Sequence, residues 1–355
     1  MEAPFEQRLQ WCRQHFRRAR QALDALPELD GVRLAFSVHL DLKMVPFFEA
    51  LVAKGAELYL TSCNPVTSDP ESLVHLSGAC VQVDVDGGSQ ERALAWQPTH
   101  LCELGGALTE ALVKRPGGSG VLGSMEGTGS GIALLEGFDL PYPIIDWDQV
   151  ELKRGLHNRY MVGLTAWHTF FSRTGLTLHG LRVAVLGFGP VGRGVAEAAR
   201  AYGGIIEILE PEPRRALEAS FAGWKVGQPS ATLAEADVVV TATGRPGVLR
   251  EQELCALKDG CFLLNVGHSS DEIDVAAMDR FEHQQVLPHI QAYRIRGKTL
   301  YLLAKGSMVN LTAGFGDSLN SFDITLAIMA NTLDYLIREG ERLPPGLHRA
   351  PDRAV

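Results

Sequence analysis

A short run of glycines near the middle of the chain has a spacing that suits the binding of a pyrophosphate. Gly187, Gly189 and Gly192 follow the order G-x-G-x-x-G, directly after the apolar run 183–186 and before a stretch of helical periodicity. In a strand–turn–helix unit the first glycine permits the tight turn, the second lets the pyrophosphate approach the backbone, and the third lets the helix pack on the strand. The motif predicts a dinucleotide site that includes Pro190 and Val191 at the helix N-terminus.

An acidic residue follows at the end of the next strand-like run. This run, IIEILE, ends on Glu210, about 20 residues after the glycines, where such sites carry the residue that binds the ribose. A carboxylate accepts hydrogen bonds from the ribose hydroxyls of NAD and repels the additional phosphate of NADP. The pattern therefore predicts NAD, and the alternative is a degenerate domain of this type that binds nothing.

The elements that must position this site alternate along the whole chain. Apolar strand-like runs alternate with helical stretches, which predicts an α/β fold. Strands are expected at 32–38, 57–63, 80–85, 99–104, 142–147, 183–186, 205–210, 238–244 and 262–268. Helices are expected at about 43–55, 158–171 and 321–339. The glycine-rich stretch 115–133 is expected to be a loop, and the tail 343–355 is expected to be loose.

Composition excludes several classes of protein. The chain has 355 residues, is 46% hydrophobic and carries a net charge of −9 without a long basic run, which indicates about two domains and no nucleic-acid partner. No apolar run approaches the ~18 residues of a membrane helix, and the N-terminal stretch is expected to be an amphipathic helix rather than a signal peptide. Six cysteines without C-x-x-C spacing predict neither a metal site nor disulfides, and favour a cytoplasmic location.

Several motifs, taken in order, resemble the adenosylhomocysteinases, which are NAD-dependent S-adenosylhomocysteine hydrolases. In the second half these are GFGPVGRG, ADVVVTATG, LLNVGHSSDEID and LAKGSMVNLTAG. In the first half they are AFSVHL, TSCN, SMEGTGSG and the K…HN pattern of VELKRGLHNRY. The resemblance extends from the first helix to about Glu339.

The resemblance implies an architecture and a reaction. A substrate domain is expected at 1–163, an inserted NAD-binding Rossmann domain at 164–313, and a C-terminal helix at 314–355 that returns to the substrate domain or an interface. In this family bound NAD⁺ takes hydride from the ribose 3′ carbon, the 5′ thiol is eliminated and water is added, and the hydride then returns. A small nucleoside-like substrate and a homo-oligomer, either a dimer or a tetramer, are implied as well.

The resemblance also implies roles for particular residues. By similarity, Lys153 is the base at the 3′ hydroxyl and Asn158 adjoins it, while His39 assists proton transfer at the 5′ leaving group. Glu126 corresponds to the ribose-binding glutamate and His268 to an active-site histidine of the cofactor domain. From the residues alone, Lys153 also fits a solvated lysine and His39 a histidine satisfied at a strand end. The remaining expected contacts to the cofactor are Thr128, Thr243, Gly244, Asn265, Gly267 and Asn310.

The chain departs from the family pattern at several site positions. ELGGA stands where the family has DDGGD, so Leu104 replaces an acid/base aspartate, and neighbouring Glu103 is expected to point to the opposite face of its strand. HLDLKM places Asp41 and Lys43 at base-contacting positions, where a lysine suits a keto oxygen, a carboxylate or a phosphate.

Further departures lie next to Lys153, the expected catalytic base, and near the C-terminus. His157 replaces the aspartate beside this lysine, and Asp317 lies near the position of a family histidine that contacts the nucleobase. Asp41, Lys43, Asn64 and His157 are the candidate substrate contacts. The given sequence does not show the basic-aromatic tail of the family, so the resemblance supports tight NAD retention and the usual tetramer less strongly.

Three classes of function remain open from the sequence. The first is an adenosylhomocysteinase-like hydrolase or lyase acting on S-adenosylhomocysteine or a related nucleoside or thioether. The second is a non-catalytic NAD-binding paralogue or regulator, which the substituted proton-transfer positions favour. The third is a simple NAD-dependent dehydrogenase, which would release reduced cofactor.

Overall fold

The chain forms two compact units, each built around its own sheet. The computed structural model describes residues 3–78, 80–115, 120–268 and 270–351. The first unit comprises 1–154 and 319–355, and the second comprises 155–318. The domain boundaries expected at 163 and 313 both lie inside the second unit.

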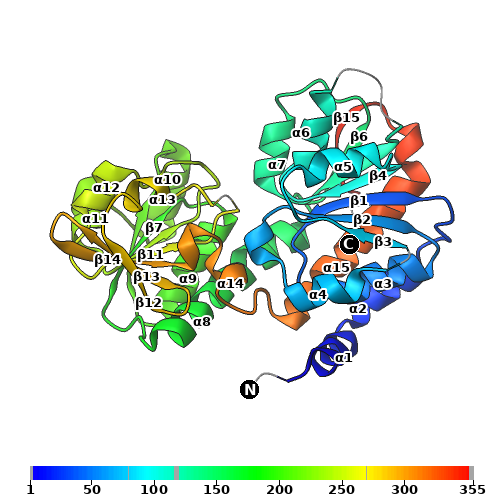
Figure 1. The fold of residues 1–355 in the computed structure, drawn as a ribbon. Coiled ribbons are helices and arrows are strands. Elements are labelled where there is room, and N and C mark those ends of the chain that lie inside the picture. Colours follow the sequence, from blue (N-terminus) through cyan, green and yellow to red (C-terminus); the bar gives the residue numbers. More distant parts are fainter. Residues whose placement is uncertain (1–2, 79, 116–119, 269, 352–355) are drawn as a thin grey trace. The chain divides into compact units, whose positions relative to one another are not determined.

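The first unit contains a parallel sheet in the order β3-β2-β1-β4-β5-β6-β15 (Figure 1). Every neighbouring pair in it is parallel. The strands are β1 (Arg33–Val38), β2 (Glu57–Ser62), β3 (Val81–Val83), β4 (His100–Glu103), β5 (Gly123–Glu126), β6 (Pro143–Asp146) and β15 (Gly346–Arg349). Strand order reverses between β1 and β4, which makes their carboxyl ends the natural place for a ligand.

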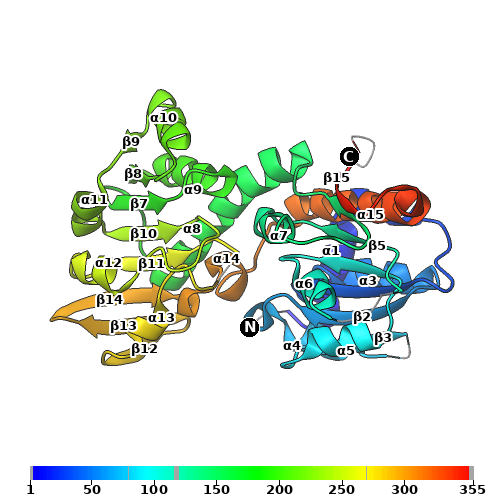
Figure 2. The ribbon, with the colours of Figure 1, turned by 90° about the horizontal axis from the view of Figure 1, so that it is seen from above.

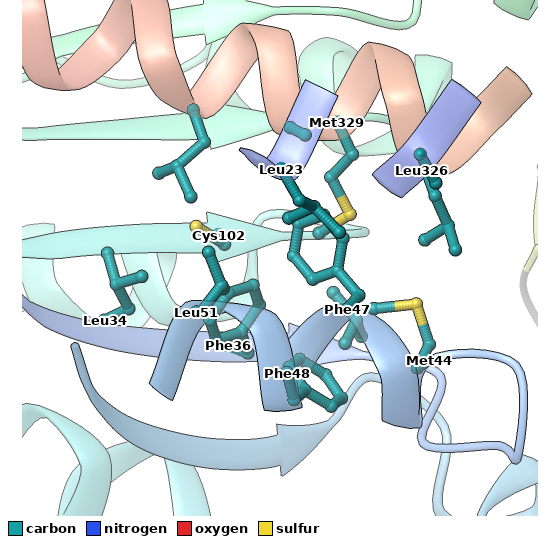
Figure 3. Packing of buried hydrophobic residues seen from close by; sticks show 14 of the residues in the cluster. Leu23, Leu34, Phe36, Met44, Phe47, Phe48, Leu51, Cys102, Leu326 and Met329 are labelled. Atoms are coloured by element: carbon teal, nitrogen blue, oxygen red, sulfur yellow. The ribbon is translucent and has the colours of Figure 1, made fainter. Parts of the chain in front are cut away.

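Helices cover both faces of this sheet, and the largest core of the unit lies on one of them. Figure 3 shows this core, where Phe47 and Met44 of the α3 region meet Leu326 and Met329 of α15. The last helix therefore completes a core begun by the first residues of the chain. The helices of the unit are α1 (Phe5–His15), α2 (Arg17–Asp24), α3 (Val45–Ala53), α4 (Pro70–Leu76), α5 (Ser89–Ala95), α6 (Ala107–Val113), α7 (Gly129–Leu135) and α15 (Leu319–Glu339).

The second unit contains a sheet in the order β9-β8-β7-β10-β11-β14-β13-β12 (Figure 2). The first six strands are parallel, and β13 and β12 extend the edge as an antiparallel hairpin. The strands are β7 (Arg182–Leu186), β8 (Ile205–Leu209), β9 (Lys225–Val226), β10 (Val238–Thr241), β11 (Phe262–Asn265), β12 (His283–Leu287), β13 (Ile290–Ile295) and β14 (Lys298–Leu303). The parallel part has the 3-2-1-4-5-6 order of a Rossmann domain, so the predicted α/β class and Rossmann insertion are confirmed.

Helices of the second unit pack closely enough to require glycine at their contacts. The π-helix η2 (Leu152–Met161) leads into α8 (Val162–Thr174), which lies against α9 (Pro190–Ala201). A Cβ on Gly194 would lie 1.3 Å from the carbonyl oxygen of Arg159, and one on Gly163 would lie 2.5 Å from the backbone of Gly194. The other helices are α10 (Pro213–Phe221), α11 (Pro229–Glu235), α12 (Glu251–Ala256), α13 (Val275–Met278) and α14 (Val309–Thr312).

Two of the sequence-based expectations were wrong. The stretch 115–133 is not one loop, because 123–126 form β5 and 129–135 belong to α7, while 116–119 lie outside the described residues. Buried neighbours at β4 and β6 supply the strand pairing that a glycine-rich sequence does not reveal. The tail is not wholly loose either, because β15 pairs with β6. In the part of the chain that the structure describes, no helix has the length and apolarity to span a membrane.

We expect Gly194→Ala to destabilise the second unit by about 1–3 kcal/mol or more, because its methyl group would overlap backbone rather than a movable side chain. Chemical denaturation followed by circular dichroism measures this. Gly189→Ala is the matched control, since a Cβ there meets no atom within 4 Å. Equal stability of the two variants, without cofactor, would contradict this account of the helix contact.

Candidate functional site

The glycine loop of the second unit has the shape of a phosphate cradle. Gly187 follows β7 with φ 97°, a conformation that favours glycine, and Pro190 opens α9 with Gly189 as its N-cap. A Cβ on Gly192 would lie 2.1 Å from the carbonyl oxygen of Gly187. Gly189, by contrast, faces open space, so its backbone is accessible to a ligand. These features fit a pyrophosphate at the N-terminus of α9.

Glu210 lies beside this loop, directly after β8. Its carboxylate accepts hydrogen bonds from the backbone N–H of Phe188 at 2.7 Å and from that of Glu212 at 3.0 Å. The acid is therefore held at the mouth of the glycine loop, as a ribose-binding residue requires. Its negative charge fits NAD and opposes a 2′-phosphate.

A buried glutamate that the sequence did not single out organises the neighbouring loop. Glu272 is fully buried, and it accepts hydrogen bonds from the backbone N–H groups of Thr243 and Gly244, at 3.0 and 2.8 Å, and from the Thr243 hydroxyl. Burial raises the pKa of Glu272. Sequence alone does not separate such a carboxylate from a solvated one, because its partners come from a loop 28 residues away.

The other predicted cofactor residues of this unit lie at the same edge. Asn265 ends β11, where its side chain accepts from the N–H of Gly267 at 2.8 Å and donates to the carbonyl of Gly306 at 2.9 Å. His268 follows in the next loop, and Asn310 is buried in α14. The expected residues thus gather at the carboxyl ends of β7, β10 and β11.

In the first unit, Glu126 ends β5 and is fully buried. Its carboxylate accepts from the backbone N–H groups of Gly105, Gly106 and Thr128 and from the Thr128 hydroxyl, at 2.7–3.1 Å. Burial, and next the carboxylate of Glu103, raise the pKa of Glu126 to about 8. Glu126 therefore has a structural role in holding the loops after β4 and β5, which the sequence did not show.

The two residues at the end of β4 point in opposite directions. The Glu103 carboxylate accepts from the N–H groups of Leu108 and Thr109 at the start of α6, while Leu104 packs against the apolar core. Glu103 therefore does not replace the missing aspartate at 104, as strand alternation predicted. Burial raises the pKa of Glu103.

His39 follows β1 and lies beside the turn after β2. Its Nδ1 lies 2.7 Å from the hydroxyl of Thr67 and 3.6 Å from Sγ of Cys63. Burial raises the pKa of Cys63, so this thiol is neutral and packed rather than nucleophilic. Asn64 caps the short turn at 65–67 with its side-chain oxygen.

The segment of the predicted base crosses from the first unit to the second. Lys153 belongs to the first unit, is 9% exposed, and has its Nζ 5.7 Å from the ring centre of Trp147. His157 and Asn158 belong to the second, where His157 Nδ1 lies 3.1 Å from Asn158 Oδ1. His157 Nε2 also lies 3.0 Å from Asp317, so the two departures from the family pattern form one buried pair.

Asp41 and Lys43 lie in the turn between β1 and α3. Lys43 is 2% exposed, and its Nζ lies 2.9 Å from the Asp41 carboxylate and 5.6 Å from the ring centre of Phe322. A buried lysine of this kind needs a fixed anionic partner, which Asp41 supplies. The pair presents a donor and an acceptor side by side.

Comparison with known proteins identifies the family. Residues 168–316 match the model of the S-adenosyl-L-homocysteine hydrolase NAD-binding domain. An S-inosyl-L-homocysteine hydrolase of Methanopyrus kandleri is 30% identical over 97% of this chain and 86% of its own length. The chain belongs to the S-adenosyl-L-homocysteine hydrolase family.

Other relatives agree with this family assignment, and a solved structure shows a similar fold. An S-inosyl-L-homocysteine hydrolase of Methanothermobacter thermautotrophicus is 30% identical over 98% of this chain and 88% of its own length. An adenosylhomocysteinase of Thermoplasma acidophilum is 29% identical over 97% of this chain and 89% of its own length. A dipicolinate synthase chain of Bacillus halodurans has a TM-score of 0.51 and 15% identity, over 88% of this chain and 99% of that one, and shows a similar fold. The predicted family, NAD cofactor and enzyme class are thereby confirmed.

Gly189→Ala should weaken NAD binding about tenfold or more, which corresponds to ~1.4 kcal/mol, because its methyl group would occupy the space where the pyrophosphate approaches the backbone. Isothermal titration with NAD⁺ measures the effect. The variant should keep the unfolding midpoint of the cofactor-free protein. Wild-type affinity in a folded Gly189→Ala protein would show that the cofactor does not use this loop.

Glu126→Gln should flatten the fall of stability between about pH 5 and pH 8. The pKa of about 8 in the folded chain lies above the ordinary 4.5, so the folded state holds this proton more tightly. That contribution is complete below the ordinary pKa and is lost as pH rises towards 8. Urea midpoints across this range test it, with the exposed Glu136→Gln as control. A slope equal to that of the wild type would count against a protonated Glu126.

Proposed function

We propose that this chain hydrolyses S-nucleosyl-L-homocysteine thioethers with NAD as a resident cofactor, and that S-inosyl-L-homocysteine is its preferred substrate. The observation that carries the choice of substrate is the ion pair between the buried Lys43 and the partly buried Asp41. Relatives of both kinds, S-inosyl-L-homocysteine hydrolases and adenosylhomocysteinases, match nearly the whole chain.

The chain's own residues supply the acid–base chemistry in this proposal. NAD⁺, when bound, accepts a hydride from the ribose 3′ carbon and later returns it. Lys153 takes the proton of the 3′ hydroxyl, and Asn158 orients the same hydroxyl. The resulting ketone acidifies the 4′ hydrogen, the 5′ thiolate leaves with a proton delivered through His39, and water adds in its place. The reaction is a hydrolysis without net redox change.

The two residues expected to contact the nucleobase, Asp41 and Lys43, support a substrate with a 6-oxopurine. Adenine offers an amino donor at position 6 beside the N1 acceptor, whereas hypoxanthine offers a keto acceptor at position 6 beside an N1–H donor. An ammonium is a donor only and an ionised carboxylate an acceptor only. Lys43 therefore suits the keto oxygen and Asp41 the N1–H, while adenine would place like groups against each other at both positions.

Leu104 bears on the step at the 4′ carbon. A leucine cannot transfer a proton, and Glu103 is committed to the N-terminus of α6. Of the groups expected to move protons on this side of the substrate, the chain keeps His39, and we assign the 4′ proton to it as well. The proposal thus makes one histidine serve two successive transfers.

The assembly and the location expected from the sequence also remain proposals. A homo-oligomer, either a dimer or a tetramer, is expected from the family. The cytoplasm is expected because all six cysteines are free, and three of them are buried.

Purified protein loaded with NAD⁺ should release homocysteine from S-inosyl-L-homocysteine at least about 100-fold more efficiently than from S-adenosyl-L-homocysteine, because the wrong base leaves buried polar groups unpaired. Free thiol, followed with a thiol reagent, measures kcat/KM for both. Lys43→Met should remove most of this preference, and the exposed Lys114→Met is its control. Lys153→Met should lower kcat about 100-fold or more while NAD⁺ still binds.

Three outcomes would contradict the proposal in different ways. A preference for the adenosyl substrate would reject the assignment of Asp41 and Lys43. Accumulation of NADH without thiol release would indicate a dehydrogenase. Binding of NAD⁺ with neither product, across a panel of nucleoside thioethers, would indicate a non-catalytic protein.

A further inference from the structure

The ammonium of Lys153 has an aromatic neighbour in its own unit. Its Nζ lies 5.7 Å from the ring centre of Trp147, within the range in which a cation is attracted to an aromatic face. Lys153 is 9% exposed and Trp147 is 2% exposed, so water screens this contact little. Both residues lie in the first unit.

The backbone ties the two residues to each other and to the sheet. The N–H of Trp147, directly after β6, donates to the carbonyl of Glu126 at 3.1 Å. The carbonyl of Trp147 accepts from the N–H of Val150 at 3.3 Å, and the carbonyl of Val150 accepts from the N–H of Lys153 at 2.9 Å. Two consecutive turns therefore fix the backbone of Lys153 relative to that of Trp147.

The indole is also fixed by the groups on its other side. A Cβ on Gly127 would lie 2.2 Å from Cζ2 of Trp147 and 2.9 Å from Cδ2 of Leu104. The ring thus occupies the space that a side chain at 127 would fill, and Leu104 packs into the same space. The departure from an acid at 104 and the presence of Trp147 produce one apolar wall.

The indole N–H indicates what tryptophan contributes here. Nε1 of Trp147 is buried, and no hydrogen-bond partner for it is found among the described residues. A buried donor of this kind is unfavourable, and a phenylalanine would avoid it. The property in which tryptophan exceeds phenylalanine is the strength of its aromatic face toward a cation.

We propose that Trp147 is a positioning residue that holds the Lys153 amine for the 3′ hydroxyl and sets the pH at which this amine becomes neutral. The inference rests on the proposed role of Lys153 as the base. Because the indole face favours the charged ammonium, replacing it by an apolar side chain favours the neutral amine and lets the amine move.

The test compares the pH profiles of Trp147→Leu, Trp147→Phe and the wild type in homocysteine release from S-inosyl-L-homocysteine. Trp147→Leu should lower kcat about tenfold, leave KM within about twofold, and move the acid limb of the profile to lower pH by about half a unit or more. Trp147→Phe keeps an aromatic face, so it should lower kcat less and move the acid limb less than Trp147→Leu does. Trp96→Leu is the matched control, since Trp96 lies under Arg33 instead.

Wild-type kcat and an unmoved acid limb in both Trp147 variants would overturn the inference. Urea unfolding of the cofactor-free protein, followed by circular dichroism, reports whether the first unit of each variant is folded. If the leucine variant is not folded, the phenylalanine variant decides. If the wild type releases no thiol, the proposed function fails. The inference about Trp147 can then be tested without catalysis, by measuring how the acetylation of Lys153 depends on pH. An equal pH midpoint of acetylation in the wild type and in Trp147→Leu would overturn the inference.

Discussion

Buried glutamates that accept hydrogen bonds from backbone N–H groups hold the functional edges of both sheets together. Parallel strands end in loops whose amides have no ladder partner, and a buried amide must find one. Glu126 serves the loops after β4 and β5, Glu103 the start of α6, and Glu272 the loop after β10. Each side chain shapes a loop next to a predicted site, so the geometry of these loops depends on buried hydrogen-bond acceptors rather than on surface residues.

The two units share a strand order and differ in what their central loops offer. In the second unit the loop after β7 exposes the backbone at Gly189, which suits a phosphate. In the first unit Glu126 already occupies the amides of Gly105 and Gly106 after β4. These two amides are therefore not available to an anionic ligand.

The departures from the family pattern become coherent when their neighbours are considered. His157 and Asp317 form a buried pair, so a change at one position is matched by a change at the other. Leu104 packs with Trp147 around Gly127, which makes one wall of the first unit apolar. Lys43 is paired with Asp41. Each of these substituted residues therefore has a partner or a packing neighbour in the structure.

The sequence by itself determined the alternation of strands and helices, the glycine turn before α9, the placing of Glu210 at the end of β8, and the opposite orientations of Glu103 and Leu104. These follow from local periodicity and spacing. Only the tertiary structure revealed β5 and β15, the roles of Glu126 and Glu272, and the partners of Lys43, His157 and Lys153. The reason is physical: these features depend on strand pairing and burial between residues distant in the chain, and a glutamate or lysine has the same letter whether it is solvated or enclosed.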